Sequence, residues 1–452
     1  AAGEADPELS RYSAHSVGVP GTVAGLLEAH TRYGSLPLYR LLSPAVTLAR
    51  EGFPVTPALA RGLRIMEESG RFNAAARSIF FDAEGRALEA GAILRQPDLA
   101  DSLDRIRELG KAGFYKGRTA ERIIATLQAG EGGMTLEDLM QYEPVWRKPV
   151  SGQFRGYEVL SMPPPSSGGV HLVQMLQMLE PFPLADWGHN SARTVHLLTE
   201  VMKRAYADRS EYLGDPDFVD VPQQALLSTS YRDLLISQLR LDGPTPSAAI
   251  RPGDLPPPES PQTTHFSIID GQGNAVSNTY TLNFTFGSGI MAEGTGILLN
   301  NEMDDFSAKP GVPNAFGLLG GEANAVAPRK RMLSSMSPTI ILKDGQVRIV
   351  TGSPGGSRII NTVLQVALNV MEFGLNAAEA VNAPRFHHQW WPDVLSMERG
   401  FPTDTRRLLL EMGHAIETDR TIGTAQTILR DDDGRLSGAA DPRAIDGAAL
   451  AF

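Results

Sequence analysis

The chain has 452 residues, of which 42% are hydrophobic and 21% are charged, and its formal net charge is −11. This composition is typical of a globular protein that is long enough to bury a large core. The acidic balance argues against a protein that binds nucleic acid, because such a protein needs a basic face. The lack of cysteine excludes disulfides, thiol catalysis and cysteine metal sites. No apolar run reaches the roughly 18–20 residues of a membrane span.

The chain opens Ala1-Ala2-Gly3-Glu4, with neither an initiator methionine nor a basic and then apolar signal segment. We expect the natural N-terminus to lie upstream of Ala1. The sequence therefore carries no information about export.

The first 240 residues are predicted to be mainly helical, because apolar residues recur at spacings of three and four. Thr135 and Asp138 form the pattern of a capping box at the start of one helix. A short strand is expected at 159–162. The helices predicted here are 43–51, 101–109, 135–142, 171–179 and 190–212.

The segment 243–262 is rich in proline and contains Pro256-Pro257-Pro258. Such a composition favours extended, solvated backbone. On composition alone, the segment is interpreted as a linker between two domains.

After this segment the pattern becomes strand-like. Runs rich in threonine, valine and aromatic residues alternate with Gly- and Asp-rich turns, which predicts three β-hairpins. The paired strands are expected at 264–269 with 275–286, 339–342 with 347–351, and 427–429 with 436–439. Helices are predicted at 361–373 and 377–381. Outer helices around twisted antiparallel sheets indicate a layered α+β architecture.

Several common catalytic patterns are missing or incomplete. The sequence has no G-x-S-x-G elbow and no H-E-x-x-H motif. The neighbours His387 and His388 would point in different directions on a helix or strand, and are interpreted as structural. The run from Gly352 to Arg358 lacks the Lys-Ser/Thr ending of a P-loop. It is either a tight turn or a nest of backbone N–H groups that binds an oxyanion.

Thr263 stands where the proline-rich segment meets the first predicted strand of the second half. A threonine hydroxyl is a poor nucleophile unless a base accepts its proton. If the peptide bond before Thr263 is cut, its own α-amino group becomes that base, because a pKa near 7.7–8.0 suits neutral pH. Any strand can begin with threonine, so the pattern alone leaves an ordinary strand residue as the alternative.

Longer motifs on both sides of Thr263 resemble those of the γ-glutamyltranspeptidases (glutathione hydrolases), from about Val19 to the end of the chain. In the first half they are Pro163-Pro164-Pro165-Ser166-Ser167-Gly168-Gly169 and Ala207-Asp208-Arg209-Ser210-Glu211-Tyr212-Leu213-Gly214-Asp215. In the second half they are Thr263-Thr264-His265-Phe266-Ser267-Ile268-Ile269-Asp270, Thr279-Tyr280-Thr281-Leu282-Asn283, Phe286-Gly287-Ser288-Gly289, Leu298-Leu299-Asn300-Asn301-Glu302-Met303-Asp304-Asp305-Phe306-Ser307, Leu333-Ser334-Ser335-Met336-Ser337-Pro338-Thr339 and Gly352-Ser353-Pro354-Gly355-Gly356-Ser357.

The resemblance implies an α+β protein with the four-layer αββα N-terminal-nucleophile hydrolase fold. It also implies a precursor that cuts itself between Gln262 and Thr263. Residues 1–262, an N-terminally truncated large-subunit region with the proline-rich tail 243–262, and residues 263–452, the small-subunit region, would fold together as one unit. The junction is therefore expected to be a processing site and not a domain border.

The resemblance also assigns site residues by position. It implies that Thr263 is the nucleophile, that Thr281 hydrogen-bonds it, and that the N–H groups of Gly355 and Gly356 bind the oxyanion. The residues implied to bind the substrate's α-ammonium group are Asn283, Glu302 and Asp305. The residues implied to bind its α-carboxylate are Ser334 and Ser335. Without the resemblance, these residues would be interpreted as a strand threonine, a tight turn, a solvated loop or cap, and turn-forming serines.

The implied reaction passes a γ-glutamyl group through Thr263 to water or to an amino acid or dipeptide. Glutathione and other γ-glutamyl compounds are the implied substrates, and the two subunits of one precursor are the implied partners. No metal or organic cofactor is needed and no nucleic acid is involved. A periplasmic or extracellular location is expected from the resemblance alone.

The sequence departs from the family pattern in three places. The family's carboxylate-binding arginine is expected upstream of Ala1, because Arg11 is too close to Gly18-Val19-Pro20-Gly21 to match it. Phe316 stands in the lid loop, Pro310 to Gly321, where a tyrosine is usual, so the balance of hydrolysis and transfer is left open. Glu302 stands where many bacterial members carry glutamine.

Two other functions were weighed. A cephalosporin (glutaryl) acylase of the same fold does not need an α-amino pocket, so Asn283, Glu302 and Asp305 argue against it. Thr263, Thr281 and the Gly355-Gly356 pair argue against an unprocessed, non-catalytic homologue.

Overall fold

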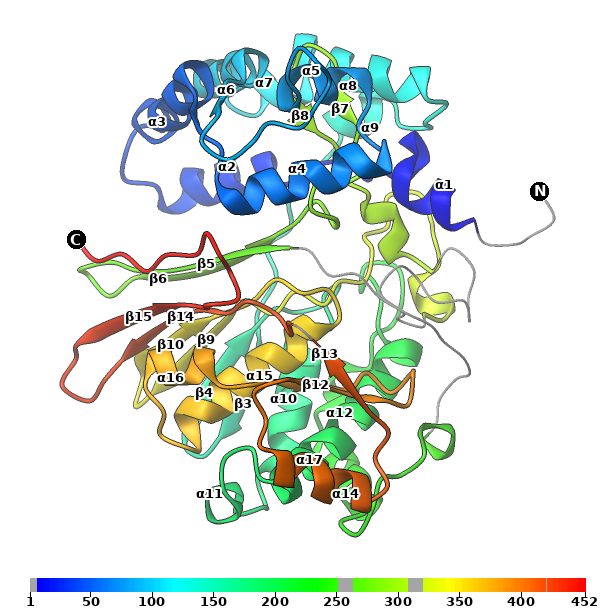
Figure 1. Ribbon diagram of the computed structural model, residues 1–452, viewed down its shortest axis with the longest axis vertical. Helices are drawn as coiled ribbons and strands as arrows, with labels where there is room; N and C mark the ends of the chain where they lie inside the picture. Colours follow the sequence, from blue (N-terminus) through cyan, green and yellow to red (C-terminus); the bar gives the residue numbers. More distant parts are fainter. Residues whose placement is uncertain (1–5, 251–262, 308–319, 420) are drawn as a thin grey trace. The chain divides into compact units, whose positions relative to one another are not determined.

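The computed structural model describes residues 6–250, 263–307, 320–419 and 421–452 (Figure 1). Gln262, Pro256-Pro257-Pro258 and the lid residue Phe316 were singled out from the sequence and lie outside these ranges.

The described chain forms two compact units, which are described separately. Unit 1 contains Arg147–Thr281 and Asp305–Phe452, and unit 2 contains Asp6–Trp146 and Leu282–Asp304.

Unit 1 is built on a six-stranded antiparallel sheet with the strand order β15-β14-β10-β9-β4-β3. A three-stranded sheet (β11-β12-β13) and a separate hairpin (β5-β6) complete its β-structure. The strands of unit 1 are β3 (Val150–Phe154), β4 (Tyr157–Ser161), β5 (Thr264–Ile269), β6 (Ala275–Tyr280), β9 (Thr339–Lys343), β10 (Gln346–Thr351), β11 (Phe386–His387), β12 (Leu395–Glu398), β13 (Ile416–Asp419), β14 (Gln426–Arg430) and β15 (Leu436–Ala440).

Helices cover one face of the six-stranded sheet, and the β5-β6 hairpin packs on the other (Figure 1). Helices α10 and α15 are buried on almost every side, as expected for helices that lie between a sheet and an outer helix. The helices of unit 1 are α10 (Gly168–Leu179), α11 (Leu184–Trp187), α12 (Ala192–Tyr212), α13 (Gln223–Leu226), α14 (Thr229–Ser237), η2 (Ser247–Ala249), η4 (Glu322–Asn324), α15 (Arg358–Met371), α16 (Ala377–Asn382) and α17 (Thr403–Glu411).

Unit 2 is mainly helical, with two short ladders, β1-β2 and β7-β8. Its interior contains an aromatic cluster in which the rings of Phe72 and Phe286 meet edge to face at 5.1 Å. The elements of unit 2 are α1 (Pro7–Tyr12), η1 (Ala14–Ser16), α2 (Thr22–Tyr33), α3 (Leu38–Glu51), β1 (Phe53–Pro54), α4 (Pro57–Ser69), α5 (Ala74–Phe80), β2 (Ile93–Leu94), α6 (Pro97–Leu109), α7 (Ala112–Tyr115), α8 (Gly117–Ala129), α9 (Leu136–Met140), β7 (Met291–Ala292) and β8 (Ile297–Leu298). The turn η3 (Glu302–Asp305) contains a boundary between the two units.

The predicted elements are largely confirmed, including the capping box in which Thr135 and Asp138 satisfy each other's backbone N–H groups. The strand predicted to reach Phe286 is wrong beyond Tyr280. Asn283 has a φ of 71°, so the backbone leaves the extended conformation there. Phe286 then enters the aromatic cluster of unit 2 and not a strand. Strand β3 was not predicted.

Candidate active site

The predicted nucleophile lies at the open end of the β5-β6 hairpin in unit 1. Thr263 directly precedes β5 and Thr281 directly follows β6, and the last ladder pair joins Thr264 to Tyr280. Continued by one step, this register sets Thr263 opposite Thr281. Directly opposed residues in antiparallel strands have Cβ atoms roughly 4.5–5.5 Å apart. The hairpin therefore brings the two predicted threonines together.

His265 attaches this hairpin to the six-stranded sheet, and sequence reasoning did not single it out. Its ring contacts Thr279 Oγ1 at 2.8 Å and Ser267 Oγ at 3.1 Å. A Cβ atom at Gly352 would lie 2.2 Å from the same ring, so only glycine fits there. Burial lowers the pKa of His265 to about 4, which keeps the ring neutral near pH 7. The start of β5 is thereby fixed against the strand that leads into the predicted oxyanion loop.

The predicted oxyanion loop connects β10 to α15. Gly355 and Gly356 have φ values of 138° and 55°, which favour glycine. In the part of the chain that the structure describes, neither of their N–H groups donates a hydrogen bond. Two adjacent unspent donors are what an oxyanion site requires, so the nest interpretation fits this loop better than a simple tight turn.

The backbone at Gly423 and Thr424 packs against this glycine loop. A Cβ at Gly355 would lie 3.3 Å from the Cα atom of Gly423, so the two backbones are in close contact. Ser353 Oγ accepts a hydrogen bond from the N–H of Thr424 at 3.0 Å. The position of the glycine loop therefore depends on the position of the backbone at 423–424.

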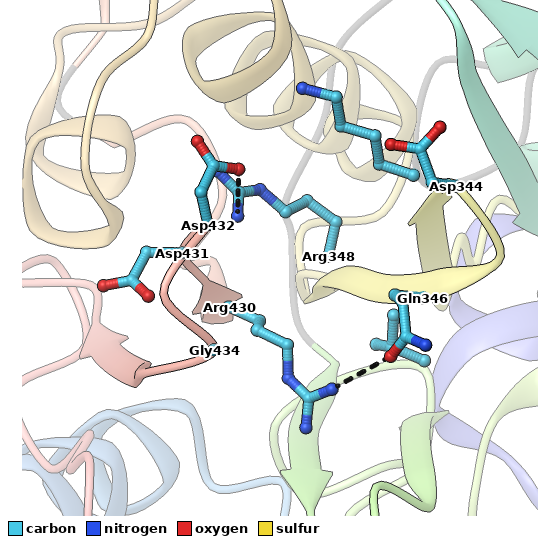
Figure 2. A pocket seen from close by; sticks show the side chains of 9 residues that line it. Asp344, Gln346, Arg348, Arg430, Asp431, Asp432 and Gly434 are labelled. Atoms are coloured by element: carbon cyan, nitrogen blue, oxygen red, sulfur yellow. Dashed lines mark hydrogen bonds and ion pairs between the residues drawn. The ribbon is translucent and has the colours of Figure 1, made fainter.

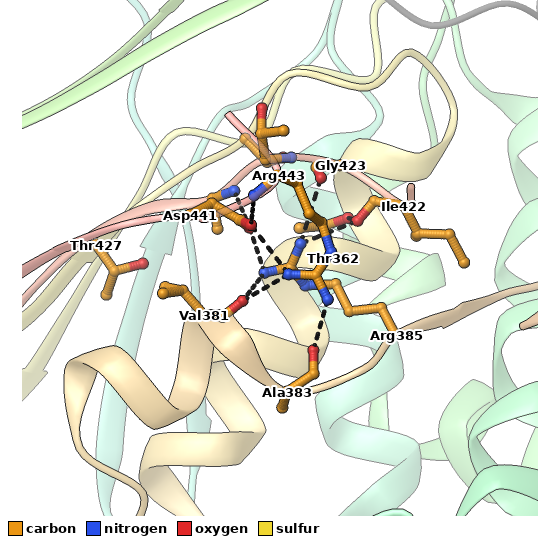
Figure 3. Close-up of polar contacts among 12 residues, drawn as sticks. Thr362, Val381, Ala383, Arg385, Ile422, Gly423, Thr427, Asp441 and Arg443 are labelled. Carbon is orange, nitrogen blue, oxygen red and sulfur yellow. Dashed lines mark hydrogen bonds and ion pairs between the residues drawn. The ribbon is translucent and has the colours of Figure 1, made fainter. Parts of the chain in front are cut away.

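Buried ion pairs hold that supporting segment (Figure 3). Arg385 is 1% exposed, pairs with Asp441 at 2.6 Å and donates to the carbonyl of Ile422 at 3.0 Å. Asp441 also pairs with Arg443 at 2.9 Å, and Arg443 pairs with Glu398 at 2.5 Å. Sequence reasoning did not find this network, because its members are spread over 385–443 and no local pattern links them.

The predicted carboxylate-binding serines lie in a loop of unit 1 that is hydrogen-bonded to the Pro163–Gly169 motif. The carbonyl of Ser334 accepts hydrogen bonds from the N–H and from Oγ of Ser167, each at 2.8 Å. Ser335 Oγ accepts a hydrogen bond from Arg209 Nη2 at 3.2 Å. The carboxylate of Asp305 is close enough to Arg209 to act on its charge. The loop, Arg209 and Asp305 thus form one group, and Arg209 is a member that was quoted in a motif but given no role.

Two of the predicted site residues, Asn283 and Glu302, lie in unit 2. Asn283 is 2% exposed, and its amide donates to the carbonyl of Asn301 at 3.0 Å. Burial raises the pKa of Glu302 to about 7. Its Oε1 atom is buried and has no hydrogen-bond partner among the described residues. A buried carboxylate with spare acceptor capacity is suited to a cation such as an ammonium group.

The adjacent histidines contact different partners, as the sequence interpretation expected. His387 contacts Asn361 and Gln389, whereas His388 pairs with Asp393 at 3.2 Å. Both are buried in unit 1, and burial lowers the pKa of each.

A separate cavity of about 300 Å³ lies between the β9-β10 and β14-β15 turns (Figure 2). Arg348, which pairs there with Asp432 at 3.0 Å, and Arg430 contribute to its lining. None of the predicted site residues lines it, so this cavity is not the candidate site.

Over the described ranges, no three histidine or acidic side chains are grouped as a metal site would need, and no helix is long and apolar enough to span a membrane.

The fold matches a solved structure over almost the whole chain. The crystal structure of cephalosporin acylase from Bacillus halodurans aligns with a TM-score of 0.85 and 31% identity, covering 99% of this chain and 80% of that one. The class is therefore the αββα N-terminal-nucleophile hydrolase, as the sequence predicted.

The chain belongs to the γ-glutamyltranspeptidase family, whose model matches residues 2–451. It is 53% identical over 444 residues to the glutathione hydrolase proenzyme of Escherichia coli strain K12, covering 98% of this chain and 77% of that protein. It is 43% identical over 447 residues to the glutathione hydrolase proenzyme of Pseudomonas sp. strain A14, covering 97% of this chain and 78% of that protein. The predicted family is confirmed, and with it an enzyme of the γ-glutamyltransferase/hydrolase type. Members of the family consist of a large and a small subunit from one precursor and act on γ-glutamyl substrates.

Proposed function

We propose that this protein is a γ-glutamyltransferase and glutathione hydrolase that matures by cleavage between Gln262 and Thr263. The observation that carries the proposal is the hairpin register, whose last pair is Thr264 with Tyr280, because one further step along it would put Thr263 opposite Thr281. Such a position gives the hydroxyl and the future α-amino group of Thr263 a fixed neighbour that can hydrogen-bond them.

Cleavage proceeds by attack of the Thr263 hydroxyl on the carbonyl carbon of Gln262. The peptide C–N bond breaks as the ester C–O bond forms, and the proton moves from the hydroxyl to the departing amine. Water then hydrolyses the ester, which leaves a carboxylate on Gln262 and restores the Thr263 hydroxyl beside the α-amino group that the first step released. That amine, with a pKa of about 7.7–8.0, serves as the base for turnover.

In turnover the α-amino group accepts the proton of the Thr263 hydroxyl as this oxygen attacks the γ-glutamyl carbonyl. The N–H groups of Gly355 and Gly356 stabilise the oxyanion, and Thr281 orients the nucleophile. The amine leaving group departs with a proton and a γ-glutamyl ester remains on Thr263. Water converts this ester to glutamate, whereas an amino acid or dipeptide converts it to a new γ-glutamyl amide.

The glutamyl group is proposed to be recognised by its two charges. Asn283, Glu302 and Asp305 bind the α-ammonium group, since carboxylates and an amide oxygen suit a cation. Ser334 and Ser335 bind the α-carboxylate with their hydroxyl groups. Glutathione is the expected donor, and free amino acids or dipeptides are the expected acceptors.

The division into subunits follows the same proposal. Residues 1–262, with the tail 243–262, form the large-subunit region, and residues 263–452 form the small-subunit region. The two regions stay folded together after cleavage, because unit 1 contains segments from both and β4 of the first pairs with β9 of the second. A periplasmic or extracellular location is proposed from the family alone.

The test compares Thr263→Ala with Thr264→Ala, which changes the neighbouring exposed threonine. The unchanged protein should give two bands on a denaturing gel, with a new N-terminus at Thr263, and should hydrolyse γ-glutamyl-p-nitroanilide. Thr263→Ala should remain a single chain with background activity, whereas Thr264→Ala should be cut and active. An unchanged protein that stays uncut and turns over nothing would refute the proposal.

A glutaryl acylase is the second candidate, because the matched structure from Bacillus halodurans is a cephalosporin acylase. Glu302 and Asp305 argue against it, since a glutaryl group carries no ammonium. Cleavage of a glutaryl amide without cleavage of γ-glutamyl-p-nitroanilide would favour the acylase.

A further inference from the structure

Arg209 carries a buried positive charge that forms no ion pair with the residues that the structure describes. It lies on α12 in unit 1 and is 4% exposed. Its Nε donates to Ser167 Oγ at 3.0 Å and its Nη2 donates to Ser335 Oγ at 3.2 Å. No carboxylate in the described part of the chain forms an ion pair with it. Buried charges are normally paired, so a cation that contacts only neutral hydroxyls leaves a local excess of positive charge.

This charge is retained at physiological pH. Burial lowers the pKa of Arg209 to about 10, and the nearby groups of Tyr206 and Asp305 act in the opposite direction. The guanidinium therefore remains protonated at neutral pH.

The hydroxyl of Ser335 is oriented by this contact. A serine hydroxyl has one donor hydrogen and two acceptor lone pairs. Ser335 Oγ uses acceptor capacity on Arg209, and no described group accepts its own hydrogen. Accepting a bond from a cation polarises a hydroxyl and makes it a stronger donor. Ser335 is therefore prepared to donate to an anionic group.

The same guanidinium also fixes the loop that carries Ser335. Ser167 accepts from Arg209 Nε and donates to the carbonyl of Ser334 at 2.8 Å. Arg209 thus donates hydrogen bonds to both segments, to Ser167 in one and to Ser335 in the other. Loss of its charge would change the direction of the Ser335 hydroxyl, whereas loss of its bulk would loosen the loop.

We propose that Arg209 is a positioning residue that acts through Ser335 to make the site select donors with a free α-carboxylate. It supplies the positive charge behind the Ser335 hydroxyl and directs the hydroxyl's hydrogen toward the carboxylate. The expected ligands are γ-amides of α-amino dicarboxylic acids, and analogues without the α-carboxylate should gain nothing from Arg209. The inference rests on the proposed function and adds a residue that selects the substrate.

The test uses the mature enzyme and the variants Arg209→Met and Arg209→Lys. L-glutamate has both the ammonium and the α-carboxylate, whereas 4-aminobutyrate lacks the α-carboxylate. Their dissociation constants are measured by calorimetry, together with KM and kcat for γ-glutamyl-p-nitroanilide. Arg204→Met is the matched control, because Arg204 is a buried arginine of the same helix that pairs with Glu200 at 2.9 Å.

Arg209→Met should weaken L-glutamate binding and raise KM by about tenfold, the effect of losing one charge-assisted contact, and should leave 4-aminobutyrate within about twofold. Arg209→Lys should restore part of the L-glutamate affinity. Arg204→Met should lower the unfolding temperature without changing the ratio of the two affinities.

The proposal is overturned if Arg209→Lys and Arg209→Met weaken both ligands equally, because the residue would then act only on the structure of the loop. If Arg209→Met does not fold, the affinities of Arg209→Lys for L-glutamate and 4-aminobutyrate provide the test. Lysine puts the positive charge in a different place, so the preference for L-glutamate should still fall. An unchanged protein that does not hydrolyse γ-glutamyl-p-nitroanilide would refute the proposed function instead.

Discussion

The interiors of the two units are both largely apolar, but they differ in the buried ion pairs that accompany the apolar side chains. In unit 1, buried ion pairs such as Arg385 with Asp441 and Arg204 with Glu200 lie among buried histidines. In unit 2, apolar clusters such as the one around Leu63 and Phe72 lie beside buried, mostly uncharged polar side chains such as Asn301. Ion pairs and hydrogen bonds are directional, whereas apolar contacts depend mainly on the area removed from water.

This difference indicates how each unit serves the candidate site. The proposed oxyanion loop and the Ser334-Ser335 loop are both in unit 1, and buried polar contacts hold each of them. A catalytic group must be held within a fraction of an ångström, which directional contacts do better than apolar packing. Equal losses of stability should therefore reduce catalysis more in unit 1 than in unit 2.

The largest effect is expected from Arg385→Met in unit 1. Removing one partner leaves Asp441 buried and partly uncompensated, which costs about 3–5 kcal/mol of unfolding free energy. The backbone at 422–424 also loses its anchor behind Gly355, so kcat should fall by about tenfold or more. Urea unfolding and steady-state kinetics measure both quantities.

The matched control for Arg385→Met is Arg407→Met, in the same unit. Arg407 pairs with Glu411 on the surface, with side-chain exposures of 61% and 56%. Loss of this exposed pair should cost about 0.5 kcal/mol or less and leave kcat unchanged. Equal destabilisation by the two variants would show that the buried network is not what stabilises unit 1.

Leu63→Ala tests the apolar interior of unit 2. Leu63 is fully buried on α4, so its truncation should cost about 2–5 kcal/mol. Its cluster contains none of the proposed site residues, so kcat should change by less than about threefold. A fall in kcat as large as that of Arg385→Met would remove the proposed distinction between the units.

Glu302→Gln is expected to change the pH dependence of substrate binding. Burial raises the pKa of Glu302 to about 7, so the side chain is mostly protonated below this pH and ionised above it. Only the carboxylate attracts an ammonium group, so KM for γ-glutamyl-p-nitroanilide should fall by up to about tenfold between pH 6 and pH 8. Glu302→Gln should abolish this change in KM and keep the pH dependence of kcat that comes from the amine of Thr263.

Stability should show the opposite trend for Glu302. Its pKa is raised in the folded state, so the folded protein binds more protons than the unfolded chain between about pH 4.5 and pH 7. Its contribution to stability is therefore largest at low pH and is lost as the pH rises through this window. Compared with the unchanged protein, Glu302→Gln should gain more unfolding free energy at pH 8 than at pH 5. If KM of Glu302→Gln depends on pH as it does in the unchanged protein, Glu302 does not bind the ammonium group.

The sequence predicts the local elements of this fold well because their signals are local. The turns at Lys343-Asp344-Gly345 and at Asp431–Gly434 have their expected hairpins. The end of β6 is missed because the residues after Tyr280 remain rich in strand-forming types. The aromatic cluster of unit 2 determines where Phe286 goes, and the phenylalanines that it meets there, Phe72, Phe80 and Phe81, lie some two hundred residues earlier in the chain.

Strand β5 of the β5-β6 hairpin turns polar side chains toward the large sheet and leaves apolar side chains exposed, which is the opposite of the usual arrangement. His265 and Ser267 bond within the hairpin and to the large sheet, while Phe266 and Ile268 are 36% and 49% exposed. Alternation alone predicts a strand here but assigns the apolar face to the core. For the same reason, the anchoring role of His265 could not be predicted from the pattern.

The candidate site residues came from motif resemblance, and their supporting residues did not. Arg209 and Arg385 act on loops that are distant in sequence, so only the folded structure relates them to Ser335 and Gly355. Arg209 belongs to a motif that sequence reasoning had identified, whereas Arg385 belongs to none.

The hairpin register has a consequence for the entropy of catalysis. Chain ends usually fray, and an N-terminal amine on a frayed end would be available to its own hydroxyl in only a fraction of conformations. The next residue, Thr264, is already paired with Tyr280 in the ladder. After cleavage, the new terminus therefore has little freedom left to lose when a donor binds, and the effective concentration of the base at its nucleophile is high from the outset.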